Sequence, residues 1–518
     1  MDRSTLASEI DSVLSVSHET FKQAVTADAE RLLEYVKDGV FDNPQAITGL
    51  EYELYAVDSE SGALERVPRR LLEYIGFEKE LGLHNAELST QPLPLNTDGI
   101  AAQEAAVRAQ LRTATACVEG ESMQLVSDGL WTIPPTDETA ETYLTETVDV
   151  SGYTVATNMS AAPRYHAMAN ADSPTQPAMK LDREYCTLEA TTVMPESLIT
   201  SIQPHYQVPD ADSLPERFRY ALRIAGPLVA LGANAPFLPP DLYDSVDPAA
   251  ICAESWVEER IPIFETVLNA PDGSRDLVAF PRDIDSVEEA IDRIATDPVL
   301  VPLETNDTGR FDDTFAAFRM KHGTYWRWVR PVFDGPTRSA ANARLEFRPL
   351  SAQPTIRDSI AFLACFAGLM EALPATDHPV RSQSWDQAES NFYAAAADGL
   401  GSDLTWITGS GEETVETIRL YEDLFAHAGE GLRMAGLDAE SVARYLGPLE
   451  RRVRYGLTPA EWKQDRVETR LREGDSLTEA ITTMQREYLE RQHRTLFTGD
   501  FSEWLEDDRY RTDNVSRR

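Results

Sequence analysis

Four short segments of the sequence alternate polar with apolar residues, as strands with two different faces do. Each segment places charged or ligand-forming side chains on one face. The four are Gly49–Leu54 with Glu51 and Glu53, His84–Thr90 with Glu87, Ser201–Val208 with His205, and Arg344–Pro349 with Arg344, Glu346 and Arg348. Hard divalent cations prefer carboxylate oxygens as ligands, and guanidinium groups bind phosphate oxygens. These residue types suit a reaction in which two anions, a carboxylate and the terminal phosphate of ATP, are brought together.

Each segment taken alone has a simpler interpretation. A strand with Glu51 and Glu53 on one face is most often the solvent-facing side of an antiparallel sheet. His205 alone is more often a hydrogen-bonded core or surface residue, and an Arg-x-Glu-x-Arg strand is more often a ladder of cross-strand ion pairs. The chemical interpretation therefore depends on all four segments converging on one cavity wall.

Acidic residues dominate the composition: 87 Asp and Glu against 47 Lys and Arg give a net charge of −40. A surface of that sign repels phosphate and offers no basic stripe, so neither nucleic acid nor an anionic membrane is expected as a partner. The acidic residues are spread along the whole chain and lysine is scarce, which predicts a salt-adapted surface. Self-repulsion at low ionic strength should then unfold or inactivate the protein when salt is removed.

The four cysteines lie far apart, without the paired spacing of metal or redox sites, and are expected to be buried or incidental thiols. Residues 1–28 are polar and acidic, unlike a signal peptide, and no apolar run approaches the length of a membrane span. We therefore expect a cytoplasmic protein without a membrane partner. Whether the chain forms a homo-oligomer stays open at this stage.

The hydrophobic pattern divides the chain into three regions. Apolar residues at three-, four- and seven-residue steps predict an amphipathic helix over Thr5–Val40, within an N-terminal region of residues 1–45. The alternating segments all fall in residues 46–373. From about Leu373 onward the strand signals stop and helical patterns take over, so residues 374–518 are expected to form a helical C-terminal region.

Within the middle region, helical periodicity returns over Thr97–Val118 and over Ser213–Leu231. The second of these helices is expected to be interrupted at Gly226-Pro227, because proline removes a donor and clashes with the preceding turn. Pro271–Arg310 is acidic and loop-rich, as an insertion would be. The aromatic residues of the strand cluster Tyr325–Pro349 could stack a purine, but core packing is the favoured interpretation.

Several motifs, in the same order, resemble segments of the glutamate-cysteine ligase family of bacteria, plants and archaea. Gly49–Leu54 is similar to that family's opening strand, the segment around Glu87 to its second glutamate strand, and Ser201–Val208 to its histidine strand. Pro163–Met168 resembles its Pro-Arg-Tyr segment. The strongest stretch, Arg344–Thr355, resembles the Glu-x-Arg strand and the start of the following helix. With the acidic surface, the resemblance points to a haloarchaeal member.

The resemblance covers most of the chain from about Gly49 to Leu400. It implies an α+β, glutamine synthetase-like fold, in which a curved antiparallel sheet forms a funnel with helices packed behind it and a C-terminal helical subdomain follows. It also implies an ATP-dependent ligase with magnesium, or manganese, as its metal. The substrates would be a glutamate-like carboxylate and an amine, with cysteine as one candidate, joined in a γ-glutamyl amide bond through an acyl-phosphate.

Site roles follow from the resemblance only where residues match the family's motifs. Those carried over are metal binding by Glu51, Glu53, Glu87 and Glu346, stabilisation of the transferred phosphoryl group by Arg348, and binding of phosphate or substrate carboxylate by Arg344 and Arg164, with His205 beside the metal or ATP.

The histidine strand departs from the family's pattern. Gln203 stands where the family often has a first histidine, and Gln207 where it has glycine. Pro204 lacks a backbone donor, which predicts an edge or bulged position. These differences leave open a non-catalytic paralogue that binds a nucleotide or an amino acid. A metal hydrolase that does not use ATP is a second alternative, less favoured because paired arginines beside a glutamate suit phosphate better than water activation.

Overall fold

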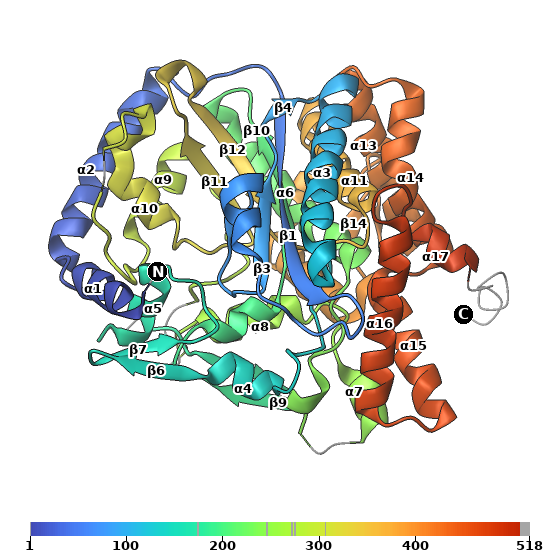
Figure 1. The fold of residues 1–518 in the computed structure, drawn as a ribbon. Helices are drawn as coiled ribbons and strands as arrows, with labels where there is room; N and C mark the ends of the chain where they lie inside the picture. The colour runs from blue at the N-terminus through green and yellow to red at the C-terminus, as the bar shows by residue number, and fades with distance from the viewer. Residues whose placement is uncertain are drawn as a thin grey trace.

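The computed structural model describes residues 2–172, 176–244, 247–270, 273, 276–305 and 307–507. A nine-stranded sheet runs through its centre (Figure 1). Its strands are β1 (Ile47–Asp58), β2 (Glu78–Lys79), β3 (Asn85–Ser89), β4 (Leu93–Pro94), β5 (Met123–Val126), β10 (Ser201–Gln207), β11 (Val329–Asp334), β12 (Asn342–Phe347) and β13 (Leu350–Ser351). Six of them follow the order β11-β12-β10-β1-β3-β2; β4 and β5 extend the pairing of β1, and β13 that of β10. All of these pairings are antiparallel.

The two faces of the sheet differ because side chains alternate along each strand. On β1, Leu50, Tyr52 and Leu54 are buried against helices α3 (Thr97–Val118), α6 (Leu214–Gly232) and α11 (Ile356–Ala375), which cover this face. Glu51 and Glu53 therefore project from the opposite face. The expected fold class, a curved antiparallel sheet with helices packed behind it, is confirmed.

A β-bulge interrupts the ladder beside β10. His205 pairs with Glu346 of β12 and Ile202 pairs with Leu350 of β13, so residues 347–349 lie opposite only two residues of β10. Pro204, which has no N–H to donate, lies in this interval. The strand itself is central rather than an edge, and the bulge changes the direction of the chain at Arg348.

The N-terminal region differs from its prediction. Two helices, α1 (Arg3–Leu14) and α2 (His18–Lys37), take the place of the single helix expected over Thr5–Val40. The break occurs at Ser17, whose side chain caps α2 by accepting a hydrogen bond from the backbone N–H of Thr20.

The predicted interruption of α6 at Gly226-Pro227 is wrong, because the helix continues through Pro227. The proline leaves the Arg223 carbonyl without its helical donor, because Pro227 has no N–H. The Pro227 carbonyl accepts a hydrogen bond from the Tyr421 hydroxyl. Gly226 lets helix α12 (Trp385–Asp398) approach closely, since a Cβ there would lie 2.9 Å from the Asn391 backbone. Close helix packing stabilises this turn in spite of the proline.

Helices dominate the C-terminal region as expected. They are α12 (Trp385–Asp398), α13 (Thr417–Met434), α14 (Ala439–Tyr455), α15 (Pro459–Glu473), α16 (Leu477–Thr495) and α17 (Ser502–Asp507). A small hairpin, β14 (Trp406–Ile407) with β15 (Glu413–Thr414), is an addition that the sequence pattern did not predict. Since α11 packs against α13 and α14, the expected boundary near residue 373 does not separate two cores.

Helix α11 corrects the expectation that no apolar run approaches the length of a membrane span. It is the one helix in the described part of the chain that is long and apolar enough to cross a bilayer. Most of its residues are buried between the sheet and the C-terminal helices. The apolar length is that of a core helix covered on all sides.

Shorter elements complete the fold around the sheet. They are α4 (Ala140–Thr145), α5 (Pro163–Asn170), α7 (Pro248–Glu254), α8 (Arg260–Leu268), α9 (Val287–Thr296), α10 (Ala316–His322) and the hairpins β6 (Thr147–Val150) with β7 (Tyr153–Ala156) and β8 (Lys180–Arg183) with β9 (Cys186–Glu189). Helix α9 lies within the segment Pro271–Arg310 that was expected to be loop-rich; part of that segment is outside the described residues.

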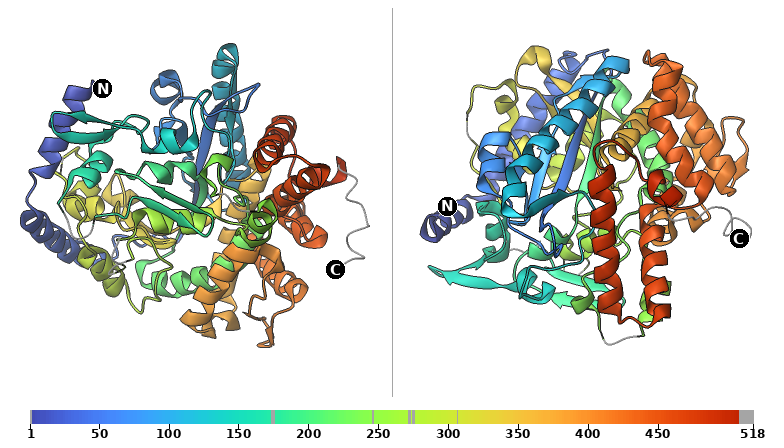
Figure 2. Two further views of the ribbon diagram at one scale, coloured as in Figure 1. Left: turned by 90° about the horizontal axis from the view of Figure 1, so that it is seen from below. Right: turned by 45° about the vertical axis from the view of Figure 1, so that its right-hand side comes forward.

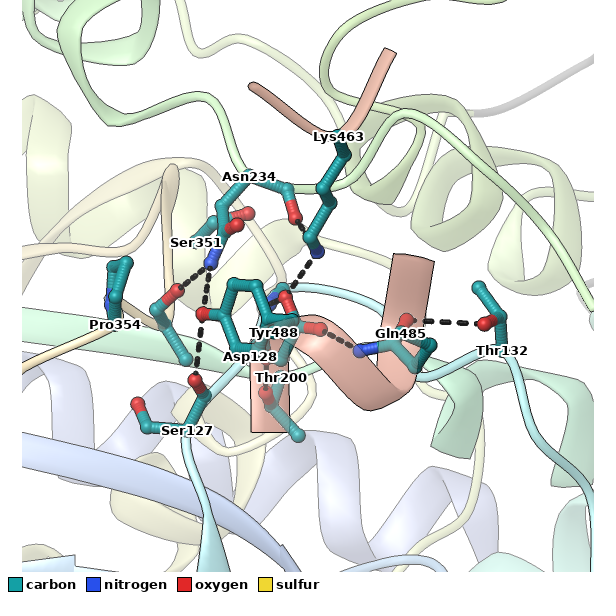
Figure 3. A network of polar contacts seen from close by, with 12 residues as sticks. Ser127, Asp128, Thr132, Thr200, Asn234, Ser351, Pro354, Lys463, Gln485 and Tyr488 are labelled. Carbon is teal, nitrogen blue, oxygen red and sulfur yellow. Dashed lines mark hydrogen bonds and ion pairs between the residues drawn. The ribbon is translucent and has the colours of Figure 1, made fainter. Parts of the chain in front are cut away.

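The C-terminal helices lie along one side of the sheet (Figure 2). A buried polar network joins them to it (Figure 3). Lys463 of α15 donates hydrogen bonds to Asp128 at 2.5 Å and to the Asn234 carbonyl at 2.8 Å. Gln485 of α16 donates to the other carboxylate oxygen of Asp128 at 2.7 Å. The backbone carbonyl of Asp128 in turn accepts from the Thr200 hydroxyl, directly before β10. The helices are thereby connected to the strand that carries the histidine.

Candidate active site

The sheet register brings the predicted side chains onto one face. In the pairing of β1 with β10, Glu51 lies opposite Gln203, and in the pairing of β1 with β3, Glu53 lies opposite Glu87. These residues line a cavity of about 220 Å³ together with Arg348. Four of the eight predicted site residues, Glu51, Glu53, Glu87 and Arg348, thus meet in one cavity.

Three carboxylates that line the cavity form a cation-binding arrangement. Oxygens of Glu53, Glu80 and Glu87 all lie within 4.8 Å of one another. Burial, with repulsion between the neighbouring carboxylates, raises the pKa of each of the three. Three oxygen donors that repel one another at close range fit a hard divalent cation such as Mg²⁺ or Mn²⁺, whose charge would allow all of them to ionise.

Glu53 is held in place by the start of β10. Its carboxylate accepts hydrogen bonds from the backbone N–H of Ser201 at 2.6 Å, the Ser201 hydroxyl at 2.8 Å and the side-chain amide of Gln203 at 2.8 Å. Gln203, the departure from the family's histidine, therefore has a definite role in orienting Glu53. It also accepts a hydrogen bond from Arg348 at 2.7 Å, which joins the acidic and basic parts of the cavity.

Two arginines that line the cavity flank a buried glutamate. The carboxylate of Glu346 lies 2.8 Å from Arg330 of β11 and 2.5 Å from Arg348. Although burial alone would raise it, these two guanidinium groups hold the pKa of Glu346 well below its ordinary value. Glu346 is thus engaged with arginines and lies outside the cluster of three carboxylates. Metal binding by Glu346 stays a prediction.

His205 and Arg344 belong to a chain of contacts beside the cavity. Arg344 donates two hydrogen bonds to Asp334, at 2.7 and 2.8 Å, and its Nε donates to Nδ1 of His205 at 3.1 Å. Since a guanidinium can only donate, His205 carries its proton on Nε2, which lies 3.1 Å from Glu51. Arg344 is therefore committed to protein partners, and the His205 ring lies beside Glu51 without an aligned hydrogen bond to it.

Arg164 lies behind the cavity rather than among its lining residues. Its Nη2 donates weakly to the Met320 carbonyl at 3.4 Å, and its guanidinium sits against Gly323, which does line the cavity. The next residue, Tyr165, lines the cavity too. A role of Arg164 in binding phosphate or carboxylate stays a prediction.

The aromatic residues of the strand cluster Tyr325–Pro349 differ in where they lie: some pack in the core, and one faces the cavity. Trp328 is buried against Phe264 and Phe392 and is part of the core. Trp326 lines the cavity and is the one aromatic residue of the cluster that is placed to contact a ligand there.

Three charged residues of the cavity were missed by the sequence reasoning. Arg330 of β11 could have been found, because it is the only charged residue within the apolar strand Val329–Phe333. Glu80 follows a two-residue strand, and Glu196 lies in the short helix η3 (Met194–Leu198). Neither segment has an alternating pattern that would signal a functional face.

Comparison with known proteins identifies the class to which this site belongs. The curved sheet bearing carboxylates and arginines agrees with the fold that the motifs implied. Glutamate-cysteine ligase family 2 (GCS2) matches residues 47–495, and the chain belongs to that family. It is therefore a ligase of the carboxylate-amine class.

Similar solved structures cover nearly the whole chain at low identity. One is glutamate-cysteine ligase from Francisella tularensis in complex with AMP, at 13% identity and a TM-score of 0.49, covering 92% of this chain and 95% of that chain. Another is a bifunctional glutathione synthetase from Pasteurella multocida, at 13% identity and a TM-score of 0.46, covering 90% of this chain and 55% of that chain. No curated protein matches the sequence.

Proposed function

We propose that this protein is a cytoplasmic, ATP- and magnesium-dependent ligase that joins the side-chain carboxylate of a glutamate-like substrate to an amine through an acyl-phosphate. One observation carries the proposal: Glu53, Glu80 and Glu87 cluster in a cavity that Arg330 and Arg348 also line. Such a cavity can hold the phosphates of a nucleotide and a carboxylate together, because it offers both a cation site and guanidinium groups.

In the first step, an oxygen of the substrate carboxylate attacks the terminal phosphorus of ATP, the bond from this phosphorus to the bridging oxygen breaks, and ADP leaves. Arg348, with Arg330 beside it, would bind the oxygens of the phosphoryl group as it moves. Glu346 fixes both guanidinium groups in position. Magnesium held by Glu53, Glu80 and Glu87 would offset negative charge on the phosphates.

In the second step, the nitrogen of the amine attacks the acyl carbon and the carbon–oxygen bond to phosphate breaks. Phosphate leaves, and the nitrogen loses a proton as the amide forms. Gln203 supports both steps indirectly. It forms hydrogen bonds with Glu53 and with Arg348, and it would thereby hold the carboxylate and the guanidinium at a fixed distance from each other. His205, with Arg344 behind it, would keep Glu51 oriented toward the same space.

The experiment is a turnover assay in molar KCl with ATP, MgCl2, glutamate and a panel of amines that includes cysteine, with phosphate release and product mass as readouts. We expect phosphate release that requires magnesium, glutamate and an amine together. Arg348→Ala should lower kcat by about 10²–10³-fold, the usual cost of losing a group that stabilises transition-state charge. Arg419→Ala, which removes an exposed arginine paired with Glu412, is the matched control and should keep full turnover.

Undiminished turnover in Arg348→Ala would contradict the assigned role. Binding of nucleotide or glutamate without any phosphate release would instead identify a non-catalytic sensor. Cleavage of γ-glutamyl compounds in the absence of ATP would identify a hydrolase.

A further inference from the structure

Asn85 is a buried amide with no partner in the protein. Its side chain lines the cavity at 5% exposure, and neither Nδ2 nor Oδ1 has a hydrogen-bond partner among the described residues. A buried amide left unsatisfied costs about 1–3 kcal/mol, so it indicates a missing ligand group. Gly82 makes room for it, since a Cβ at Gly82 would lie 2.3 Å from Oδ1.

Glu196 lines the same cavity as this amide. The next residue, Ser197, also lies against Gly82, since a Cβ at Gly82 would lie 2.9 Å from the Ser197 Cβ. The Ser197 backbone carbonyl lies 2.9 Å from Nε2 of His84. The Glu196 carboxylate lines the cavity, and within the described ranges it forms neither a hydrogen bond nor an ion pair. It is not one of the three carboxylates that converge within 4.8 Å, although repulsion from Glu80 and Glu53 adds to burial in raising the pKa of Glu196. A half-buried carboxylate without donors is compensated best by a cationic, hydrogen-bonding group.

We propose that Asn85 and Glu196 form the subsite for the α-ammonium group of the glutamate-like substrate. This inference rests on the proposed function and adds to it the feature that selects an amino acid over a simple dicarboxylate. The Glu196 carboxylate and the Asn85 Oδ1 would both accept from the ammonium, and the Asn85 Nδ2 would donate to the adjacent carboxylate of the same substrate.

The spectator ammonium fits this subsite better than the attacking amine does. The attacking nitrogen must be neutral when it reacts, and an anionic contact would hold it in its protonated, unreactive form. The α-ammonium keeps its charge through both steps, so a permanent ion pair with Glu196 costs no reactivity. Its distance from the reacting carboxylate lets it anchor the substrate while the other end reaches the phosphoryl group.

The test compares glutamate with glutarate, which is the same chain without the amino group. Hydroxylamine replaces the amine, so that hydroxamate formation measures activation of either acid, and calorimetry measures binding of each acid with magnesium and a non-hydrolysable ATP analogue. Wild type should prefer glutamate by about 100-fold in kcat/KM and in affinity, the range expected for a hydrogen bond to a charged group. Glu196→Gln should lower the glutamate values by about that factor and leave glutarate within about threefold.

Asn85→Ala should reduce the glutamate values by about tenfold with glutarate unchanged. Glu189→Gln, which removes an exposed carboxylate on β9, is the matched control and should change neither acid. Thermal unfolding should show Glu196→Gln to be at least as stable as wild type without ligand, because the amide has no ionisation for burial to oppose.

An equal loss for glutamate and glutarate in Glu196→Gln would overturn the inference, since Glu196 would then act on the metal or the fold. Equal use of the two acids by wild type would overturn it as well. Absence of hydroxamate with every acid would instead refute the ligase proposal, and the calorimetric preference for glutamate would still decide the subsite.

Discussion

Buried carboxylates in this protein fall into two groups that behave differently. Glu346 lies between two guanidinium groups, which keep it ionised. Glu265 of α8 has no cationic partner among the residues that the structure describes: one oxygen accepts hydrogen bonds from the Trp328 indole at 2.8 Å and the Tyr393 hydroxyl at 2.9 Å. Burial, only partly offset by these bonds, raises the pKa of Glu265 to about 7.

This carboxylate should make folding stability depend on pH. The unfolded chain releases its proton near pH 4.5 and the folded chain near pH 7, so the folded state binds more protons between these values. The contribution of the neutral carboxyl group to the free energy of unfolding is complete below about pH 4.5 and is lost as the pH rises through 7. The loss amounts to up to about 3 kcal/mol, because one pKa unit corresponds to about 1.4 kcal/mol.

Glu265→Gln keeps the shared acceptor oxygen and removes the titration. Denaturant unfolding at pH 5 and pH 8 should therefore show a smaller loss of stability in Glu265→Gln than in wild type, whereas Glu189→Gln should match wild type. An identical loss in wild type and Glu265→Gln would show that Glu265 is ionised in the folded protein at pH 5.

At the scale of elements, the contact of α11 with α13 depends on glycine. A Cβ at Gly431 would lie 1.8 Å from the Gly368 carbonyl oxygen, and a Cβ at Gly368 would lie 2.4 Å from the Ala428 carbonyl oxygen. The two backbones touch directly at these positions, so no side chain fits between them. This contact holds the C-terminal helices against the core helix that supports β10 and β1.

Gly431→Ala should destabilise the protein by several kcal/mol, because the helices must separate, although alanine favours a helix over glycine by about 1 kcal/mol. Gly447→Ala in α14 is the matched control: its Cβ would meet only the flexible end of Arg451, at 3.1 Å. It should be neutral or slightly stabilising in denaturant unfolding. Equal effects of the two substitutions would show that α11 and α13 can move apart without loss.

At the scale of the whole molecule, a net charge of −40 acts on every compact state of the chain. Many acidic groups are paired with arginine, as in Arg381 with Glu216 and Arg444 with Glu104, but acidic residues far outnumber the basic ones. The remaining repulsion is screened over about 3 Å in molar salt and over about 10 Å at 0.1 M.

The melting temperature should therefore rise steeply with KCl between 0.1 and 3 M, because screening removes repulsion that the unfolded chain largely escapes. Thermal scans at a series of KCl concentrations measure this. Betaine at matched osmolality does not screen charge and should not replace KCl. A melting temperature that is independent of KCl would refute salt adaptation.

Alternation along individual strands was enough to predict which side chains share a face. Glu51 and Glu53, and likewise Arg344 and Glu346, follow from a period of two that the backbone imposes on every strand. The helical C-terminal region followed from the 3.6-residue period in the same way. The break at Ser17 and the continuity of α6 did not follow, because a cap and a close interhelical contact outweigh local propensity.

Residue types and their order along the chain were enough to indicate the class of chemistry, because they set which ligands the chain can offer. Which residues act together depends on the folded chain: Glu80 and Glu196 come from short connecting segments, and Asn85 is unsatisfied only because the cavity surrounds it. The difference arises because the periodicity of a strand or helix depends only on residues that are close together in the sequence. A cavity, in contrast, is defined by sheet register and loop closure between residues far apart in the chain.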